Sequence, residues 1–231
     1  MSRSLFTSRE GGVSSTPYLT FNLATHVGDD LQSVEKNREK LAFDLGLPST
    51  SLFFMNQVHG SDVEVIDENS SSTTLPSVDS LFTTAKGVAL VTLVADCIPL
   101  LLHSARAVAA VHVGRKGLLA GVFQETLRQF HRHGIHSGEI KAELGPSICG
   151  RCYEVDQDLY DDVVTQLPST STEFSSDAGK PSLDIQAGLT SLLDSAGVIW
   201  SSSQVCTMHD SGYFSYRRDG ITGRQAGVIA L

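Results

Sequence analysis

Two short apolar runs in the middle of the chain carry its strongest hydrophobic pattern. Residues 88–94 and 107–113 are almost wholly apolar and rich in β-branched side chains, and His112 interrupts the second run. Runs of this length and composition predict strands that are buried on both faces. The first run is followed by Asp96 and Cys97, an acid and a thiol that are costly choices for a protein core. A cysteine and a histidine therefore lie near the ends of two strands that can be neighbours.

The helical pattern is clearest over residues 117–133, where apolar positions recur every three or four residues and Gly134 follows the last of them. This periodicity predicts an amphipathic helix that ends at the glycine. Similar patterns predict helices over residues 30–46, 156–167 and 184–197, strands over residues 51–55, 62–66, 139–144, 198–200, 205–207 and 226–229, and a polar loop over residues 169–180. We expect a hairpin turn at residues 218–220, because an Asp-Gly pair accommodates the positive φ angles of a type I′ turn.

Helices and strands alternate irregularly along the chain, and no repeat is visible. We therefore expect an α+β fold, a single domain over residues 1–231 in which helices flank mixed β-sheets. With 231 residues, of which 41% are hydrophobic, the chain is long enough to bury a substantial core.

The net charge and the cysteines indicate which partners and which cellular compartment suit this chain. A formal net charge of -9 makes a nucleic-acid backbone or an anionic membrane surface an unfavourable partner. No apolar run approaches the roughly 18 residues that a membrane span needs, and the first residues lack the pattern of a secretion signal. The four cysteines then favour free or metal-bound thiols in a reducing compartment. We expect a cytoplasmic protein with no nucleic-acid or membrane partner and no obligate protein partner.

Three potential metal ligands, His59, Cys97 and His112, lie in or near the ends of predicted strands. Two imidazoles and one thiolate form a ligand set that leaves a fourth position for water, as in a catalytic zinc site. Because the three residues are far apart in the sequence, only the fold can bring them together. A hydrogen-bonded core histidine and a small buried thiol would explain the same residues without a metal.

The same residues allow a different reaction class. Cys97 as a thiolate nucleophile, with His112 as its base, would make an acyl-transfer enzyme. The two readings differ in one respect: a metal enzyme loses activity on chelation, whereas a thiol enzyme loses it on alkylation.

The remaining cysteines give a weaker signal. Cys149 and Cys152 form a lone CxxC pair, which does not complete a zinc site, and it lacks the strand-to-helix context of a thioredoxin-like motif. We expect this pair to have little influence on metal content or turnover. Cys206 has no partner nearby in the sequence, and we expect it to lie in the core.

Two basic segments are candidate anion sites. Residues 114–117 read Gly-Arg-Lys-Gly where a strand turns into a helix, so free backbone N–H groups and two cations coincide there. Arg217, Arg218 and Arg224 form a second basic group near the end of the chain. An exposed basic turn and a solvated hairpin tip are the alternative interpretations of these two segments.

Eight short blocks, in order along nearly the whole chain, resemble those of the laccase-domain, or YfiH-type, family. They are TSREGGVS (7–14), NLATHVGDD (22–30), NQVHG (56–60), ADCIPLLL (95–102), AAVHVG (109–114), GPSICGRCYEV (145–155), LDI (183–185) and FSYRRDGITGR (214–224). The resemblance implies a single YfiH-like α+β domain and a zinc-dependent enzyme. It implies phosphorolysis of adenosine, inosine and methylthioadenosine and deamination of adenosine, and a bacterial branch is implicated in editing peptidoglycan precursors.

The family motifs map onto the candidate metal ligands residue by residue. The histidine of QxHG matches His59, the cysteine of ADC matches Cys97, and the histidine of HAGWRG matches His112. In the last motif this chain has Arg115 and Lys116 in place of the aromatic residue and the arginine. Lysine keeps the charge but loses the bidentate geometry of a guanidinium, so substrate preference is expected to differ while the metal site is unchanged. Three ligands without further histidine clusters do not provide for the several coppers of a laccase.

We therefore expect a zinc-dependent purine nucleoside phosphorylase with adenosine deaminase activity, with Zn²⁺ as cofactor and purine nucleosides and phosphate as its small-molecule partners. His59, Cys97 and His112 are the expected catalytic and metal-binding residues. Substrate contacts are expected from Arg9, Gln57, Asp96, Lys116 and Arg218. A peptidoglycan-precursor editing hydrolase that uses Cys97 and His112, and a zinc-binding protein without turnover, are the alternatives.

Overall fold

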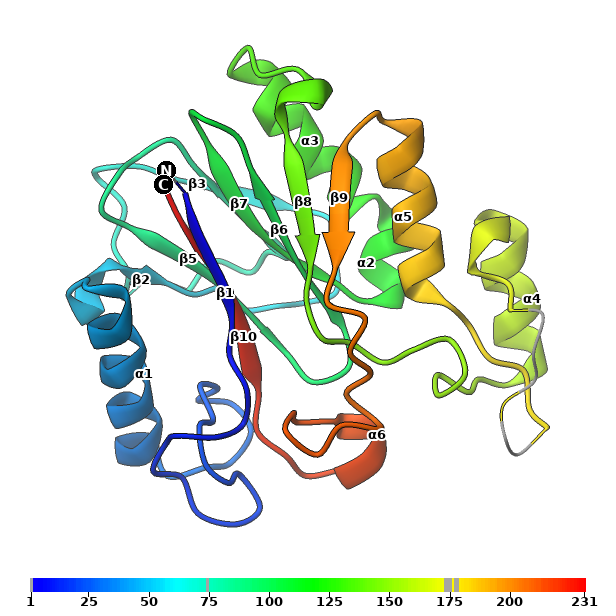
Figure 1. Ribbon diagram of the computed structural model, residues 1–231, viewed down its shortest axis with the longest axis horizontal. Helices are drawn as coiled ribbons and strands as arrows, with labels where there is room; N and C mark the ends of the chain where they lie inside the picture. Colours follow the sequence, from blue (N-terminus) through cyan, green and yellow to red (C-terminus); the bar gives the residue numbers. More distant parts are fainter. Residues whose placement is uncertain (1, 74, 173–175, 177–178) are drawn as a thin grey trace.

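Two β-sheets form the centre of the protein in the computed structural model, which describes residues 2–73, 75–172, 176 and 179–231 (Figure 1). The smaller sheet has the order β1 (Arg3–Phe6), β10 (Gln225–Ala230), β5 (Ala89–Val94) and β2 (Leu52–Phe53). The larger has the order β3 (Val63–Ile66), β4 (Ser80–Thr83), β7 (Val108–Val113), β6 (Ile98–His103), β8 (Lys141–Leu144) and β9 (Ile199–Ser202). Both sheets are mixed, because β2 runs parallel to β5, β3 to β4 and β8 to β9, whereas the other pairs are antiparallel.

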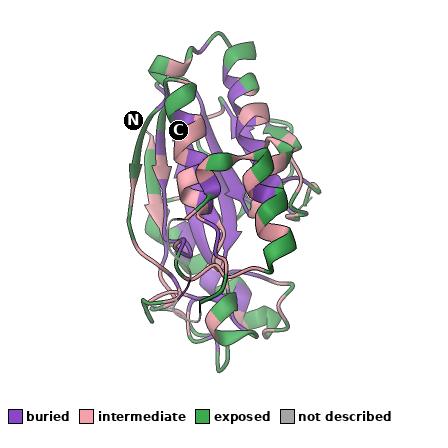
Figure 2. Ribbon diagram, turned by 90° about the vertical axis from the view of Figure 1, so that its right-hand side faces the viewer, coloured by how far each residue is buried: buried purple, intermediate pink, exposed green. Residues whose placement is uncertain are grey.

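The sheets pack face to face, and helices cover their outer faces (Figures 1 and 2). A buried apolar cluster that includes Leu81, Leu90, Leu101 and Ile229 joins the two sheets. Helix α1 (Leu31–Leu45) packs on the smaller sheet. The larger sheet is covered by α2 (Arg115–Ala120), α3 (Val122–Arg132), α4 (Gln157–Gln166) and α5 (Ile185–Ser195). The chain is thus a single α+β domain with helices flanking mixed sheets, as expected from the sequence.

The helix ends follow the expected capping chemistry. The side chain of Asp30 accepts the N–H of Ser33 at the start of α1, and Gly46 ends that helix with a φ of 70°. Asp184 accepts the N–H of Ala187 at the start of α5. A carboxylate at the first position and a left-handed glycine at the last satisfy N–H and C=O groups that lack partners within the helix.

The structure corrects three details. Residues 117–133 do not form one helix, because Gly121 has a φ of 88° and separates α2 from α3. Residues 218–220 do not form a hairpin turn but end the short helix α6 (Tyr216–Asp219). Residues 205–207 contain only an isolated bridge between Ser147 and Cys206. The expected polar loop over residues 169–180 begins within a 3₁₀ turn, Pro168–Thr170, and its residues 173–175, 177 and 178 lie outside the described residues.

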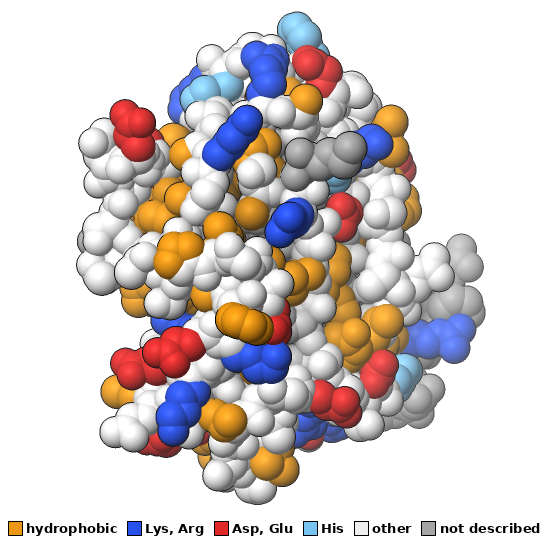
Figure 3. Space-filling model, turned by 60° about the vertical axis from the view of Figure 1, so that its left-hand side comes forward, with side chains coloured by type: hydrophobic (Ala, Val, Ile, Leu, Met, Phe, Trp, Pro, Cys, Tyr) orange, Lys and Arg blue, Asp and Glu red, His pale blue; other side chains and the backbone are white. Residues whose placement is uncertain are grey.

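The surface and the helix lengths bear on the expected partners. On the face shown in Figure 3, acidic and basic side chains are interspersed rather than separated into large patches. Within the part of the chain that the structure describes, no helix has the length and apolar character needed to cross a bilayer.

Candidate metal centre

His59, Cys97 and His112 meet at one end of the larger sheet. Their potential ligand atoms all lie within 4.8 Å of one another, and the two imidazole rings are 4.7 Å apart between centroids. His112 is the penultimate residue of β7, and Cys97 immediately precedes β6. Because Pro99 of β6 lies opposite His112, the β6–β7 pairing brings the thiol and the imidazole together. The two apolar runs form β5 and β7, which lie in different sheets. The neighbouring strands that bring the cysteine and the histidine together are therefore β6 and β7, not β5 and β7.

Asp79 organises both histidines. Its buried carboxylate accepts the backbone N–H groups of Val58, His59 and Gly60 at 3.1, 3.0 and 2.7 Å. Its Oδ1 atom also lies 2.7 Å from Nδ1 of His112. An ionised carboxylate can only accept hydrogen bonds, so Nδ1 of His112 carries the hydrogen and Nε2 is left free to bind a metal. The three N–H contacts stabilise the loop in which His59 adopts a φ of 59°.

Gly114 makes room for the other histidine. A Cβ atom at this position would lie 2.7 Å from Nδ1 of His59 and 3.1 Å from Sγ of Cys97. The backbone of Gly114 is extended, with a φ of -92°. The glycine is therefore required by the close approach of the ligand side chains and not by its own backbone conformation.

The pKa values of the two histidines shift in opposite directions. Burial alone would lower the pKa of His112, but the charge of Cys97 and the hydrogen bond with Asp79 raise it to about 9. For His59, burial and the charge of His112 lower the pKa. Burial would raise the pKa of Asp79, yet hydrogen bonds from His112 and from the Gly60 N–H hold it below its ordinary value. Positive charge is thus favoured at His112, beside Cys97 and Asp79, and a divalent cation can supply that charge in place of the proton.

The three residues open into a cavity of about 320 Å³. His26, Gln57, Tyr216 and Arg224 line the same cavity, together with residues 93–95 at the end of β5. Burial lowers the pKa of Arg224, and burial together with the nearby charge of Arg224 lowers the pKa of His26. Three N and S donors with an open side facing a solvent-accessible cavity fit a catalytic metal site, in which the fourth position is left for water or substrate.

Two of the expected substrate residues lie near this cavity, but their polar atoms are engaged. Gln57 lines it, while Nε2 donates to the carbonyl of Leu93 at 2.7 Å and Oε1 accepts the N–H of Leu93 at 2.8 Å. Asp96 accepts the hydroxyl of Thr207 and the backbone N–H of Arg217, each at 2.7 Å. Both side chains therefore hold the segments around the site together by hydrogen bonds.

The three expected cations lie elsewhere. The described residues that line the cavity do not include Arg9, Lys116 or Arg218. Arg9 bonds to the carbonyl of Leu19, and Lys116 is exposed on α2. Arg218 donates to several backbone carbonyls between residues 207 and 213 and pairs with Asp219. The arginine that does line the cavity is Arg224, which the sequence placed in a second basic group.

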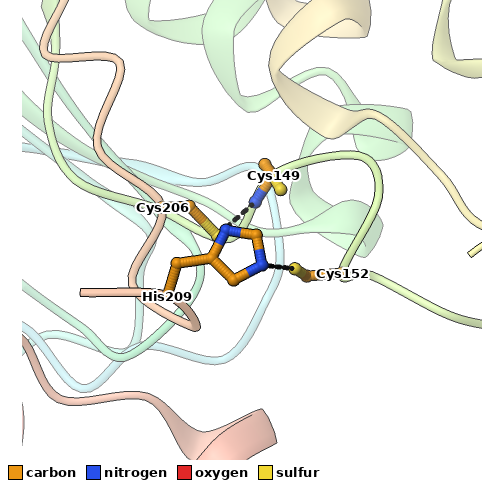
Figure 4. Close-up of side chains that lie close together, drawn as sticks. All are labelled: Cys149, Cys152, Cys206 and His209. Atoms are coloured by element: carbon orange, nitrogen blue, oxygen red, sulfur yellow. Dashed lines mark hydrogen bonds between the residues drawn. The ribbon is translucent and has the colours of Figure 1, made fainter. Parts of the chain in front are cut away.

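The predictions for Cys206 and for the CxxC pair need correction (Figure 4). Cys206 does not lie alone in the core, because its Sγ atom accepts the N–H of Cys149 at 3.4 Å. Cys149, Cys152, Cys206 and His209 form a second group whose potential ligand atoms lie within 4.8 Å of one another. The pair does have partners, and the sequence signal that identifies them is the CxxH spacing of Cys206 and His209.

Comparison with known proteins identifies the family. Residues 3–231 match the model of the family described as multi-copper polyphenol oxidoreductase laccase. A purine nucleoside phosphorylase of Streptomyces coelicolor is 42% identical over 229 residues, which cover 98% of this chain and 94% of the relative. One from Corynebacterium glutamicum is 42% identical over 233 residues, covering 99% and 94%.

Solved structures show the same fold. YlmD from Geobacillus stearothermophilus is 31% identical, with a TM-score of 0.89 and coverage of 99% of this chain and 91% of that one. The YfiH protein of Bacillus licheniformis is 27% identical, with a TM-score of 0.90 and coverage of 100% and 92%. Because the family model matches nearly the whole length of this chain, the chain belongs to the laccase-domain family of YfiH-like proteins.

Proposed function

We propose that this protein is a zinc-dependent purine nucleoside phosphorylase that acts on adenosine, inosine and methylthioadenosine. The observation that carries the proposal is the opening of the His59, Cys97 and His112 group into a cavity that also contains an arginine. The relatives named purine nucleoside phosphorylase, at about 42% identity, support this reaction class. Phosphorolysis breaks the C1′–N9 bond of the nucleoside and forms a bond from C1′ to a phosphate oxygen, while the base leaves with a proton.

His59, Cys97 and His112 are the proposed metal ligands. Two imidazoles and a thiolate suit Zn²⁺ better than Mg²⁺ or Ca²⁺, which prefer oxygen donors. When bound, zinc would supply a Lewis acid at the open side of the group. Because two histidines and one cysteine are also the ligand set of blue-copper proteins, metal analysis has to separate zinc from copper.

Arg224 is the proposed phosphate contact. Arg224 lines the cavity beside the proposed metal ligands and is largely buried, so its charge acts in a medium of low dielectric. Its Nη1 atom donates to the carbonyls of Thr222 and Gly223 at 2.9 Å, which holds the guanidinium in place. His26 lines the same cavity and can donate a further hydrogen bond. Tyr216 is 61% exposed and also lines the cavity, where its ring offers a face for a purine to stack on.

Adenosine deamination is a second proposed activity, because an open metal site with three protein ligands also suits attack by water. The hydrolase alternative, with Cys97 as nucleophile and His112 as base, rests on the same contact between the two side chains. In this alternative, activity survives removal of the metal and is lost on alkylation of the thiol.

The test is a phosphate-dependent assay on protein of known metal content. We expect release of hypoxanthine from inosine and of adenine from adenosine and methylthioadenosine, in proportion to phosphate and to bound zinc. Inosine formed from adenosine without phosphate would report deamination. Base release that is independent of phosphate, or bound zinc without turnover of any nucleoside, would overturn the proposed reaction. Activity that persists after chelation would favour the thiol hydrolase.

A further inference from the structure

A second group of potential metal ligands is built from two matching turns, which we call the cysteine–histidine cluster: Cys149, Cys152, Cys206 and His209. In the first turn the N–H of Cys152 donates to the carbonyl of Cys149 at 3.0 Å. In the second the N–H of His209 donates to the carbonyl of Cys206 at 3.1 Å. Each turn therefore presents a first and a fourth residue as ligands, as the paired turns of structural zinc sites do.

Backbone contacts hold the two turns against each other. Ser147 and Cys206 form a parallel bridge, in which Ser147 donates to the carbonyl of Val205 and accepts from the N–H of Thr207 at 3.2 and 3.1 Å. The N–H of Cys149 then donates to Sγ of Cys206 at 3.4 Å, so one sulfur already accepts a hydrogen bond from the opposite turn. Such N–H···S contacts stabilise negative charge on sulfur.

The side chains of the cluster converge on one point (Figure 4). Four potential ligand atoms, three Sγ and one imidazole nitrogen, lie within 4.8 Å of one another. Sγ of Cys152 lies 3.1 Å from Nε2 of His209. With Zn–S distances of about 2.3 Å and Zn–N distances of about 2.0 Å, the ligands of a tetrahedral site lie somewhat less than 4 Å apart. Small side-chain movements would bring the four atoms to these positions.

We propose that the cysteine–histidine cluster binds a structural Zn²⁺ ion through three thiolates and one imidazole. Four protein ligands close the coordination sphere, so this ion would have no open position and would not act on substrate. Binding releases the thiol protons and involves no oxidation or reduction. This site shares no ligand with His59, Cys97 and His112, so its occupancy can be tested whether or not the proposed phosphorylase reaction is correct.

The donor set favours zinc over the alternatives. Three soft thiolates disfavour Mg²⁺ and Ca²⁺, and one imidazole with three thiolates is a common structural zinc set. A disulfide would use two of the sulfurs and leave the third cysteine and His209 without a role. It would also need an oxidant.

The proposed ion would stabilise the segment that carries Cys97. Thr207, which lies between Cys206 and His209, donates its hydroxyl to Asp96 at 2.7 Å. Asp96 has a φ of 91° and directly precedes Cys97. The second turn therefore supports the strained segment that presents the Cys97 thiol, and loss of the ion would loosen that segment.

The experiment counts zinc in variants that separate the two groups. Protein purified under reducing conditions is expected to carry about two zinc ions per chain, and Cys97→Ala about one. X-ray absorption of the Cys97→Ala protein should show three sulfur ligands at about 2.3 Å and one nitrogen ligand at about 2.0 Å. A Cys97→Ala protein without zinc, with the other three thiols free or two of them in a disulfide, would overturn the proposal.

His209→Asn provides a second measurement that does not disturb a cysteine. Because His209 is exposed, the variant should fold, and its cluster should lose zinc to a competing chelator at least about tenfold more readily than the wild type. The matched control is His131→Asn, since His131 is an exposed histidine on α3 outside both groups, and it should retain zinc like the wild type. Equal retention in His209→Asn and the control would rule out the imidazole as a ligand.

Discussion

Oδ1 of Asp79 lies 2.7 Å from Nδ1 of His112, and the same carboxylate accepts the backbone N–H groups of Val58, His59 and Gly60. One buried acid thus sets the tautomer of one proposed metal ligand and the backbone of the other. Removing it is expected to impair metal binding even though Asp79 is not one of the proposed ligands.

Asp79→Asn should lower the affinity of the His59, Cys97 and His112 site for zinc by about 10- to 100-fold. An amide has one acceptor oxygen, so its NH₂ group must face either the loop N–H groups or Nδ1 of His112. In the second case Nδ1 becomes the acceptor, and the hydrogen moves to the nitrogen that would bind the metal. The measurement is competition with a chromophoric chelator, using Cys206→Ser protein so that only this site is counted.

The control for this prediction is Asp62→Asn. Asp62 is exposed, and its backbone carbonyl, not its side chain, accepts the N–H of Asp79. Zinc affinity should therefore be unchanged in the control. Equal affinity in Asp79→Asn and Asp62→Asn would show that Asp79 does not position a metal ligand.

Gly114→Ala should have a comparable effect for a steric reason. The new Cβ atom would lie 2.7 Å from Nδ1 of His59, and the extended backbone allows alanine, so the clash falls on the ligand. We expect zinc affinity and turnover to fall by at least about tenfold. Gly138→Ala is the matched control, because a Cβ atom there would meet nothing within 4 Å. A Gly114→Ala protein with wild-type zinc affinity would contradict the close packing of His59 against this glycine.

The sequence pattern revealed the proposed metal ligands but not the residue that supports them. His59, Cys97 and His112 stand out because each interrupts or borders an apolar segment. Asp79 gives no such signal, since Ser77, Val78 and Ser80 around it form no motif. Its position depends on the pairing of β4 with β7, in which Ser80 lies opposite Val111. Fully buried strands also look alike in either sheet, so the division of β5 and β7 between two sheets could not be predicted from composition.

The cysteine–histidine cluster was missed for a different reason. Its two turns are separated by residues 153–205, and long-range contacts such as the bridge between Ser147 and Cys206 bring them together. The CxxH spacing of Cys206 and His209 was present in the sequence, but a search for a second CxxC pair does not find it. Likewise, Arg218 and Arg224 belong to one basic group in the sequence, and only the fold separates Arg224, which lines the cavity, from Arg218, which lies in α6 and donates to the carbonyl of Thr207.

Arg224→Lys should weaken phosphorolysis mainly by raising the apparent KM for phosphate. Loss of a charge-assisted contact costs about 1.5–3 kcal/mol, which is about ten- to a hundredfold. Lys116→Ala is the matched comparison, since Lys116 is an exposed cation on α2, and it should change this KM much less. The measurement is the initial rate of base release against phosphate concentration. A larger increase in this KM for Lys116→Ala than for Arg224→Lys would instead assign phosphate binding to residues 114–117, at the start of α2.

Arg218→Lys should destabilise the protein without changing the KM for phosphate. The guanidinium donates to the carbonyls of Thr207 and Tyr213 at 2.6 and 2.7 Å and to both carboxylate oxygens of Asp219. A lysine cannot reproduce this planar set of donors, so we expect a loss of about 2 kcal/mol in the free energy of unfolding. For a chain of this size that corresponds to a fall in Tm of about 4–8 °C. Arg128→Lys, at an exposed ion pair with Glu125 on α3, is the control and should shift the free energy of unfolding by less than about 0.5 kcal/mol. An unchanged Tm together with a raised KM for phosphate would instead assign Arg218 to substrate binding.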